Sequence, residues 1–258
     1  MKKTKWDAIQ YNKFHSLRQK PNIDLLSALP KQEFNNILDL GSGNGDLSSS
    51  LLLELNPKSK IIAIDSDKES IQQGKKNFQN ITWIHSQAEK YKFTKSFDLI
   101  TCCSMFQWIE QHNKYIPYFF KKLNINGYLC IQMPNMFSSK FYTLISVTLK
   151  ELHLEKKVGH LRKNPVHTED EYKEIISNLT SNYEIWEKTY NQKLVGRDSL
   201  IEWSKGAPLR PVISRLTSNE LSDFMNIYHQ KLTKYYPYNG EHYILPFSRL
   251  FLILQKTN

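Results

Sequence analysis

The chain has 258 residues, 40% of them hydrophobic, which is enough to bury a full core in one large domain with a smaller cap. It contains no run of eighteen apolar residues, so the sequence predicts no membrane span, and the basic N-terminus lacks the apolar segment of a secretory signal. The three cysteines lack the spacing to histidine that is typical of metal sites, so we expect a reduced, cytoplasmic protein without a bound metal.

The formal charge of +10 leaves three interpretations open. A basic surface can bind nucleic acid, attract a small anionic substrate, or be an ordinary lysine-rich solvated surface. The lysines are scattered, acids lie near them, and no block of five or six basic residues occurs. We therefore expect a solvated surface or a small anionic partner rather than nucleic acid. We also expect a monomer or weak dimer.

The N-terminal 35 residues precede the first predicted strand. Apolar residues at helical spacing predict a helix that ends at Pro30. Before it lie aromatic residues, among them Trp6 and Tyr11, which either pack on the core or close over a pocket.

The stretch 36–45 reads Asn-Ile-Leu-Asp-Leu-Gly-Ser-Gly-Asn-Gly, a short apolar strand that runs into Gly41, Gly43 and Gly45. Leucines at helical spacing follow, so strand, glycine turn and helix form the opening unit of a doubly wound α/β sheet. Glycines let the backbone turn tightly and let a ligand lie against free N–H groups at the helix start.

The spacing of these glycines and the acid before them discriminate between two cofactors. A dinucleotide fingerprint reads G-x-G-x-x-G, whereas this chain has G-x-G-x-G with Asp39 just before it. A carboxylate at this place repels a pyrophosphate but attracts an ammonium group. S-adenosylmethionine carries an ammonium, a carboxylate and a sulfonium but no phosphate, so the motif favours S-adenosylmethionine over NAD.

A second apolar strand, 60–65, ends in Asp65, about twenty residues beyond the glycine turn, where doubly wound folds place the carboxylate that holds ribose hydroxyls. Ser66 and Glu69 have the spacing of a capping box, so we expect a helix to start at once. Further strands are predicted at 81–84, 97–104 and 127–134. Gln87 follows the third strand and either bonds an adenine edge or lies in a surface loop.

The helix after the fourth strand is predicted to end at Asn126-Gly127, and His112 at its start is expected to be solvated rather than catalytic. Beyond a helix at 138–154 and a basic stretch at 156–163, capping boxes at Thr168 and Thr217 predict two more helices, and strands are predicted at 183–190 and 243–254. We divide the chain into four parts: N-terminal arm and helix (1–35), cofactor-binding core (36–136), cap helices (137–182), and the end of the sheet with inserted cap helices (183–258).

The glycine motif at 39–45 together with Ile-Asp at 64–65 resembles the first two cofactor motifs of class I S-adenosylmethionine-dependent methyltransferases. Further segments, in register along nearly the whole chain, resemble the trans-aconitate 2-methyltransferase family. They are Trp6-Asp7 with Tyr11, Phe-Gln-Trp at 106–108 with His112, Ile-Gln-Met-Pro-Asn at 131–135, Gly-Ala-Pro-Leu-Arg-Pro at 206–211, and Leu-Pro-Phe-Ser-Arg-Leu-Phe at 245–251.

The resemblance implies a doubly wound, seven-stranded, mostly parallel α/β sheet with an antiparallel last strand and a helical cap. It also implies, position by position, the residues that contact S-adenosylmethionine. These are Gly41, Ser42 and Gly43 for the methionine part, Asp65 and Ser66 for the ribose, Gln87 and Ala88 for adenine, and Cys103, Ser104 and Trp108 beside the sulfonium. The chain departs from the family at Gln87, where Asp is usual, and at Cys103, where Asn is common.

The reaction implied is methyl transfer to a carboxylate oxygen of a small polycarboxylic acid. A carboxylate is already ionised at neutral pH, so no general base is expected. Arg210 is the first candidate for holding the acid, because a guanidinium can grip a carboxylate bidentately. The further candidates are Trp6, Tyr11, Tyr190, Tyr236 and Arg249.

Four alternatives remain open at this point. The acceptor can be another carboxyl group, such as a malonyl group on a carrier protein, or the chain can bind S-adenosylmethionine without catalysis. A nucleic-acid methyltransferase is disfavoured because the Asn/Asp-Pro-Pro-Tyr/Phe motif is missing after the fourth strand. An NAD dehydrogenase is disfavoured by the glycine spacing.

Overall fold

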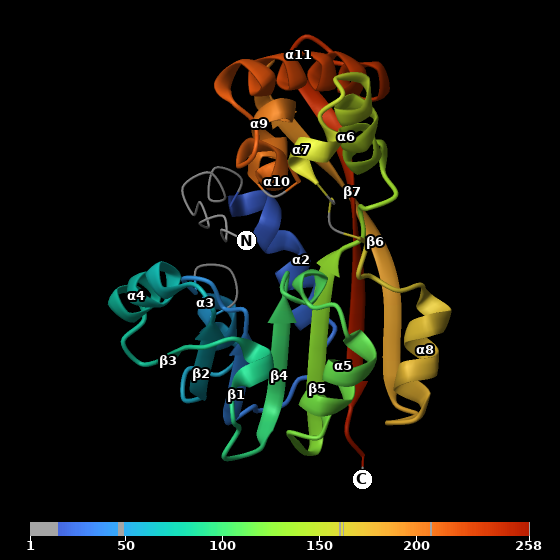
Figure 1. Cartoon of the computed structure of the whole chain (residues 1–258). Coiled ribbons are helices and arrows are strands. Elements are labelled where there is room, and N and C mark those ends of the chain that lie inside the picture. The colour runs from blue at the N-terminus through green and yellow to red at the C-terminus, as the bar shows by residue number, and fades with distance from the viewer. Residues whose placement is uncertain (1–14, 46–48, 160, 162, 207, 258) are drawn as a thin grey trace. The chain divides into compact units, whose positions relative to one another are not determined.

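A computed structural model describes residues 15–45, 49–159, 161, 163–206 and 208–257, and Figure 1 shows its elements along the chain. The strands are β1 (Asn36–Leu40), β2 (Lys60–Asp65), β3 (Thr82–His85), β4 (Phe97–Cys103), β5 (Leu123–Pro134), β6 (Tyr183–Val195) and β7 (His242–Gln255). The α-helices are α2 (His15–Ser27), α3 (Ser49–Leu55), α4 (Lys68–Asn77), α5 (His112–Phe120), α6 (Lys140–Glu151), α7 (Glu155–Val158), α8 (Glu169–Ser177), α9 (Ser199–Gly206), α10 (Arg210–Ile213) and α11 (Ser218–Tyr235). Two 3₁₀ turns, η1 (Ala88–Lys90) and η2 (Phe106–Trp108), follow β3 and β4.

The seven strands form one sheet in the order β3-β2-β1-β4-β5-β7-β6. β1 pairs in parallel with β2 and β4, β2 with β3, and β4 with β5, whereas β5 and β7 run antiparallel. The prediction of a doubly wound, seven-stranded sheet with an antiparallel last strand is confirmed. No helix in the described part of the chain is both long and apolar enough to cross a bilayer.

The described residues divide into two compact units. The sheet unit comprises residues 15–134, 165–188 and 249–257, and the helical unit comprises residues 135–164 and 189–248 without the gaps named above. The chain passes from one unit to the other within β6 and within β7.

The core of the sheet unit is formed by the inner strands and the helices beside them. In β1, Ile37, Leu38 and Leu40 have no exposed surface, because a parallel strand is covered on both faces. α5 presents Ile116, Phe119 and Phe120 as one buried face. Burial of these side chains fixes the register that brings the strand ends to one edge.

In the helical unit, α6 and α11 pack along their apolar faces. Tyr228 of α11 is fully buried and donates a hydrogen bond of 2.6 Å from its hydroxyl to the carbonyl of Phe141 in α6. At the rim, Lys231 pairs with Glu151 at 2.6 Å. The capping boxes predicted at Thr168 and Thr217 are confirmed, and they open α8 and α11.

The capping box predicted at Ser66 is wrong. Asp67 is the N-cap of α4, and its side chain accepts the backbone N–H of Ser70 at 2.9 Å. The backbone N–H of Asp67 is itself bonded to Asp65 Oδ1 at 2.7 Å, and this bond keeps the chain out of the helix until Lys68.

The predicted helix stop at Asn126-Gly127 is also wrong. The helix ends at Phe120, and β5 already runs from Leu123 to Pro134. A Cβ on Gly127 would lie 2.9 Å from the carbonyl oxygen of Asn124, so close backbone approach within an irregular strand requires glycine there. The positive φ of 64° falls on Asn126 instead.

Candidate functional site

The sheet order reverses beside β1, because β2 lies on one side of it and β4 on the other. Ligands of open α/β sheets bind at such a switch point, outside the carboxyl ends of the strands. The glycine turn follows β1, Asp65 ends β2, and Cys103 ends β4. Since these strands are parallel, all three features lie at the same edge of the sheet.

The turn at 41–45 has the left-handed backbone geometry that glycine adopts easily. Gly41, Gly43 and Gly45 have φ values of 72°, 57° and 86°, a region in which side chains are costly. The N–H groups of Gly41 and Ser42 both donate to the carbonyl of Ile64, at 2.8 and 3.1 Å. These bonds hold the turn against the end of β2.

Two of these glycines face different surroundings. A Cβ on Gly41 would lie 2.4 Å from Cγ of Met105, so this glycine is needed for close packing. A Cβ on Gly43 would meet no described atom within 4 Å. The backbone at Gly43 therefore borders open space, as a cradle for the predicted cofactor requires.

Asp65 faces this turn. Its Oδ2 accepts the N–H of Gly43 at 2.8 Å and its Oδ1 accepts the N–H of Asp67 at 2.7 Å. Burial raises the pKa of this carboxyl above its usual value, although the backbone bonds oppose the shift. Each carboxylate oxygen has two lone pairs, so both can still accept a hydroxyl. The residues present thus fit a cofactor with a ribose.

Asp39 is fully buried in β1, unlike an ordinary strand-end acid. Its Oδ1 accepts the hydroxyl of Thr101 at 2.9 Å and its Oδ2 accepts the hydroxyl of Ser49 at 3.3 Å. A buried carboxylate is tolerated where hydrogen bonds compensate its lost hydration. Thr101 was not predicted as part of the site. The hydroxyl of Thr101 between apolar neighbours in β4 is the sequence feature that could have indicated it.

The end of β4 is tied to β5 and β7 by a second polar cluster. Ser104 has a φ of 56°, and its N–H donates to the carbonyl of Gln132 at 2.8 Å. Arg249 is 3% exposed and donates from Nη1 to Ser104 Oγ at 2.6 Å and to Gln132 Oε1 at 2.7 Å. The structure therefore joins a predicted cofactor residue, Ser104, to a predicted substrate residue, Arg249. Gln132 was not among the residues predicted for the site.

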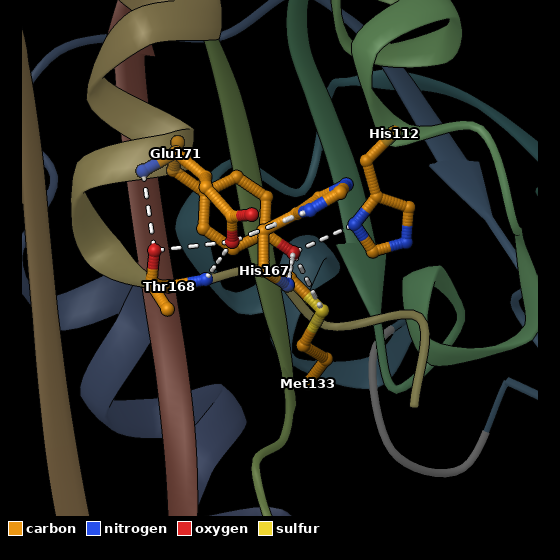
Figure 2. A network of polar contacts seen from close by, with 6 residues as sticks. His112, Met133, His167, Thr168 and Glu171 are labelled. Carbon is orange, nitrogen blue, oxygen red and sulfur yellow. Dashed lines mark hydrogen bonds and ion pairs between the residues drawn. The ribbon is translucent and has the colours of Figure 1, made fainter. Parts of the chain in front are cut away.

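A buried histidine, His112 (Figure 2), is hydrogen-bonded to the first residue of η2. His112 has no exposed surface, its Nε2 bonds the carbonyl of Phe106 at 2.9 Å, and its Nδ1 lies 2.6 Å from the hydroxyl of Tyr172. A carbonyl only accepts, so Nε2 carries the proton of this bond. The expectation that His112 is solvated is wrong, because both ring nitrogens have buried hydrogen-bond partners that replace water.

The hydroxyl of Tyr172 also lies 3.8 Å from the sulfur of Met133, and Figure 2 shows Thr168 and Glu171 bonded to each other beside this network. Burial raises the pKa of Tyr172 well above its usual value, so it remains protonated and can donate. The network joins α8 to the segment after β4 and serves the architecture of the sheet unit.

The three cysteines are free thiols. Cys102 and Cys130 are fully buried, and Cys103 is partly buried at the site edge. Burial raises the pKa of each thiol, with nearby Asp39 adding to the shift for Cys102 and Cys103. They remain protonated, so at the site edge Cys103 presents a neutral group.

The remaining predicted cofactor residues lie after β2, β3 and β4. Ser66 directly follows β2, and Ala88 is buried at the start of η1. Gln87 precedes η1, and its backbone carbonyl accepts two backbone N–H groups. Trp108 is the last residue of η2, and 48% of its surface is exposed. In the described part of the chain, no three His, Cys, Asp or Glu residues come together around one metal position.

The predicted substrate residues of the helical unit lie on three elements. Tyr190 is buried in β6, Arg210 begins α10, and Tyr236 follows α11 with its ring 6.5 Å from that of Phe141. Burial raises the pKa of Tyr236. Trp6 and Tyr11 lie outside the described residues.

The chain is similar to known proteins over its full length. Residues 32–201 match the family model described as a methyltransferase domain. Two relatives named trans-aconitate 2-methyltransferase, from Escherichia coli O7:K1 and Shigella dysenteriae serotype 1, are 28% identical over 254 residues, which is 98% of this chain and 98% of each relative.

Solved structures share the fold at lower sequence identity. The YcgJ protein from Bacillus subtilis is 15% identical with a TM-score of 0.60, covering 93% of this chain and 99% of that one. The plantazolicin methyltransferase BamL, solved in complex with a triazolic desmethylPZN analogue and SAH, is 14% identical with a TM-score of 0.53, covering 97% of this chain and 90% of that one.

Proposed function

This chain belongs to the methyltransferase domain family and uses S-adenosylmethionine, and from this premise we propose that it converts a carboxylate of a small polycarboxylic acid of the trans-aconitate type into a methyl ester. The observation that carries the proposal is the similarity to relatives named trans-aconitate 2-methyltransferase. It spans 98% of both chains, so it includes the helical unit as well as the glycine turn.

In this proposal the edge of the sheet unit holds the cofactor, which supplies a methyl group activated by its sulfonium. The open backbone at Gly43 and the free lone pairs of Asp65 support this placement. Asp39 attracts the ammonium group electrostatically. The other cofactor residues proposed are Gly41, Ser42, Ser66, Gln87, Ala88, Cys103, Ser104 and Trp108.

The chain's contribution to the chemistry is positioning and exclusion of water. An acceptor carboxylate has a pKa of about 4 and is ionised at neutral pH, so it needs no general base. This agrees with the role of His112, whose two ring nitrogens hold Phe106 and Tyr172 in place. Exclusion of water from around the acceptor oxygen makes that oxygen more nucleophilic.

A polyanionic acceptor needs positive partners. Arg249 is buried at the end of β4, where Ser104 and Gln132 fix its guanidinium. Arg210 is proposed to grip a second carboxylate, with Trp6, Tyr11, Tyr190 and Tyr236 as further contacts. The net charge of +10 favours the approach of small anions.

The test is an assay of the purified protein with S-adenosylmethionine and a panel of di- and tricarboxylic acids that includes trans-aconitate. The expected result is formation of S-adenosylhomocysteine together with a product heavier than the acid by one CH₂. A malonyl group on a carrier protein is assayed in parallel, and selective turnover of that acceptor would overturn the proposal. Binding of S-adenosylhomocysteine without turnover of any acid would show a binding protein instead.

A further inference from the structure

Ser104 directly follows β4, at the edge of the sheet unit where the cofactor is proposed to bind. Its φ of 56° is a left-handed conformation that glycine adopts easily and that is costly for a residue with a side chain. Residues held in such conformations cluster at active sites and ligand-binding sites. The chain thus keeps a hydroxyl group at a position where the backbone alone would favour glycine.

The backbone of Ser104 already has both of its hydrogen bonds within the sheet unit. Its N–H donates to the carbonyl of Gln132 at 2.8 Å. Its own carbonyl accepts a hydrogen bond from Nε2 of Gln107 at 2.7 Å. These bonds fix the residue in place, and the hydroxyl is the polar group that remains for a ligand.

Two donors occupy the hydroxyl oxygen of Ser104. Nη1 of Arg249 lies 2.6 Å from Oγ, and a guanidinium only donates. The same Nη1 donates to Oε1 of Gln132 at 2.7 Å, which fixes the orientation of that amide and leaves Nε2 at 3.2 Å from Oγ. An amide nitrogen also only donates, so both lone pairs of the Ser104 oxygen are in use.

The hydrogen of the Ser104 hydroxyl therefore points away from both donors, and Oγ donates to no acceptor in the part of the chain that the structure describes. Arg249, Gln132 and Asn22 are buried, and Asn22 of α2 holds Gln132 by accepting Nε2 at 2.7 Å. Ser104, in contrast, is partly exposed. The buried network thus ends in one O–H donor at the surface, with the positive charge of Arg249 behind it.

The electrostatics of this donor favour an anion. The hydrogen end of the O–H dipole and the guanidinium behind it both repel a positive sulfonium and attract a carboxylate. Hydrogen bonds to an ionised acceptor are also shorter and stronger than neutral ones. The position proposed for Ser104, beside the sulfonium, is also the position that an acceptor carboxylate has to reach for in-line transfer.

We propose that the Ser104 hydroxyl donates a hydrogen bond to the carboxylate that receives the methyl group, on the oxygen that stays unmethylated, and that Gln132 is the positioning residue that turns this hydrogen outward. This inference rests on the proposed function and uses side chains of the sheet unit alone. The other carboxylate oxygen bonds to the methyl carbon while the carbon–sulfur bond breaks and leaves its electron pair on sulfur. No proton moves in this step, so the hydroxyl keeps its hydrogen and orients the acceptor.

The first test removes the hydroxyl in two ways. Ser104→Ala keeps a side chain at the φ of 56° and Ser104→Gly does not, so an effect shared by both variants comes from the hydroxyl. Calorimetry measures the Kd of trans-aconitate for protein saturated with S-adenosylhomocysteine. We expect this Kd to rise roughly 10- to 100-fold in both variants, because a hydrogen bond to a charged group is lost, and KM to rise with it. The Kd of S-adenosylhomocysteine itself is expected to stay close to that of wild type.

Asn126→Gly is the matched control, because Asn126 is exposed, has a φ of 64° and lies near the start of β5 in the same unit. It should leave both Kd values unchanged. An acid Kd within about threefold of wild type in both Ser104 variants would overturn the inference and leave the proposed function standing. An equal rise in the Kd of S-adenosylhomocysteine would also overturn it, because Ser104 would then contact the cofactor rather than the acid.

Gln132→Glu tests the positioning role without touching Ser104. Glutamate keeps an acceptor for Arg249 but places a carboxylate oxygen where Nε2 lies, so the Ser104 hydrogen turns inward to that oxygen. Acid affinity should fall as in Ser104→Ala, and should fall no further when both changes are combined. Repulsion by the added charge, or a structural defect, would instead make the two losses multiply and would overturn the positioning role. A wild-type protein that neither binds nor methylates any polycarboxylic acid would overturn the proposed function and, with it, this inference.

Discussion

Gly43→Ala tests whether the open side of the glycine turn is the face that binds the cofactor. The added Cβ would meet no described atom within 4 Å, so it creates no clash in the free protein. The cost comes from the φ of 57°, about 1–2 kcal/mol for a residue with a side chain. Reduced freedom of the unfolded chain offsets about 0.4–1 kcal/mol of this. A net loss of about 1 kcal/mol lowers Tm by roughly 2–4 °C for a chain of this size.

Cofactor affinity is also expected to fall, because the added methyl group occupies the space in which the cofactor is proposed to lie. We expect at least a tenfold rise in the Kd for S-adenosylhomocysteine, measured by calorimetry. Gly240→Ala is the matched control, since Gly240 also has a positive φ and open surroundings but lies in the helical unit. If Gly43→Ala binds S-adenosylhomocysteine within twofold of wild type, the open side of Gly43 is not the cofactor face.

Four further outcomes are expected. As the pH falls, cofactor affinity should decline at a higher pH than it would with an ordinary aspartate, because the pKa of Asp65 is raised. Titration calorimetry of wild type and Asp65→Asn across pH checks this. The same raised pKa means that protonation of Asp65 makes the cofactor-free fold more stable. Arg210→Ala should weaken acid affinity at least tenfold and leave S-adenosylhomocysteine affinity nearly intact, and equal loss of both would remove Arg210 from the substrate site. His112→Phe should lower the free energy of unfolding by about 2–4 kcal/mol in urea titrations, because Phe106 and Tyr172 lose buried partners, and a smaller change would show that water replaces the imidazole. Thr168→Ala should lower the free energy of unfolding by about 1 kcal/mol, because α8 loses its cap, and should leave turnover unchanged. A fall in turnover in an activity assay of the same sample would contradict this.

The sequence predicts features that depend on short-range geometry. Gly41, Gly43 and Gly45 have the positive φ values that a tight turn after a strand requires, and Asp65 faces that turn. The short apolar run of β2 is observed at the predicted residues, 60–65, whereas β5 begins before the predicted 127 and β6 continues past the predicted 190. These signals are local, so one sequence carries them.

Features that depend on distant pairing are not visible in the sequence. Arg249 lies 145 residues from Ser104 and 117 from Gln132, and their bonds require the observed register of β7 against β5. Inserted cap helices were expected between 183 and 258, but the sequence predicted no bounds for α9 and α10, because their short apolar faces resemble loop segments. The turn at 126–127 was misread because Asn126, rather than the glycine, adopts the positive φ.

The raised pKa values of its thiols make this protein convenient for site-directed labelling. Cys102, Cys103 and Cys130 are all the cysteines in the sequence, and each has its pKa raised by burial, so their thiolate populations at neutral pH are small. A cysteine introduced on an exposed helix would outcompete them for a maleimide dye. A fluorophore placed in this way would report ligand binding while the native cysteines stay unlabelled.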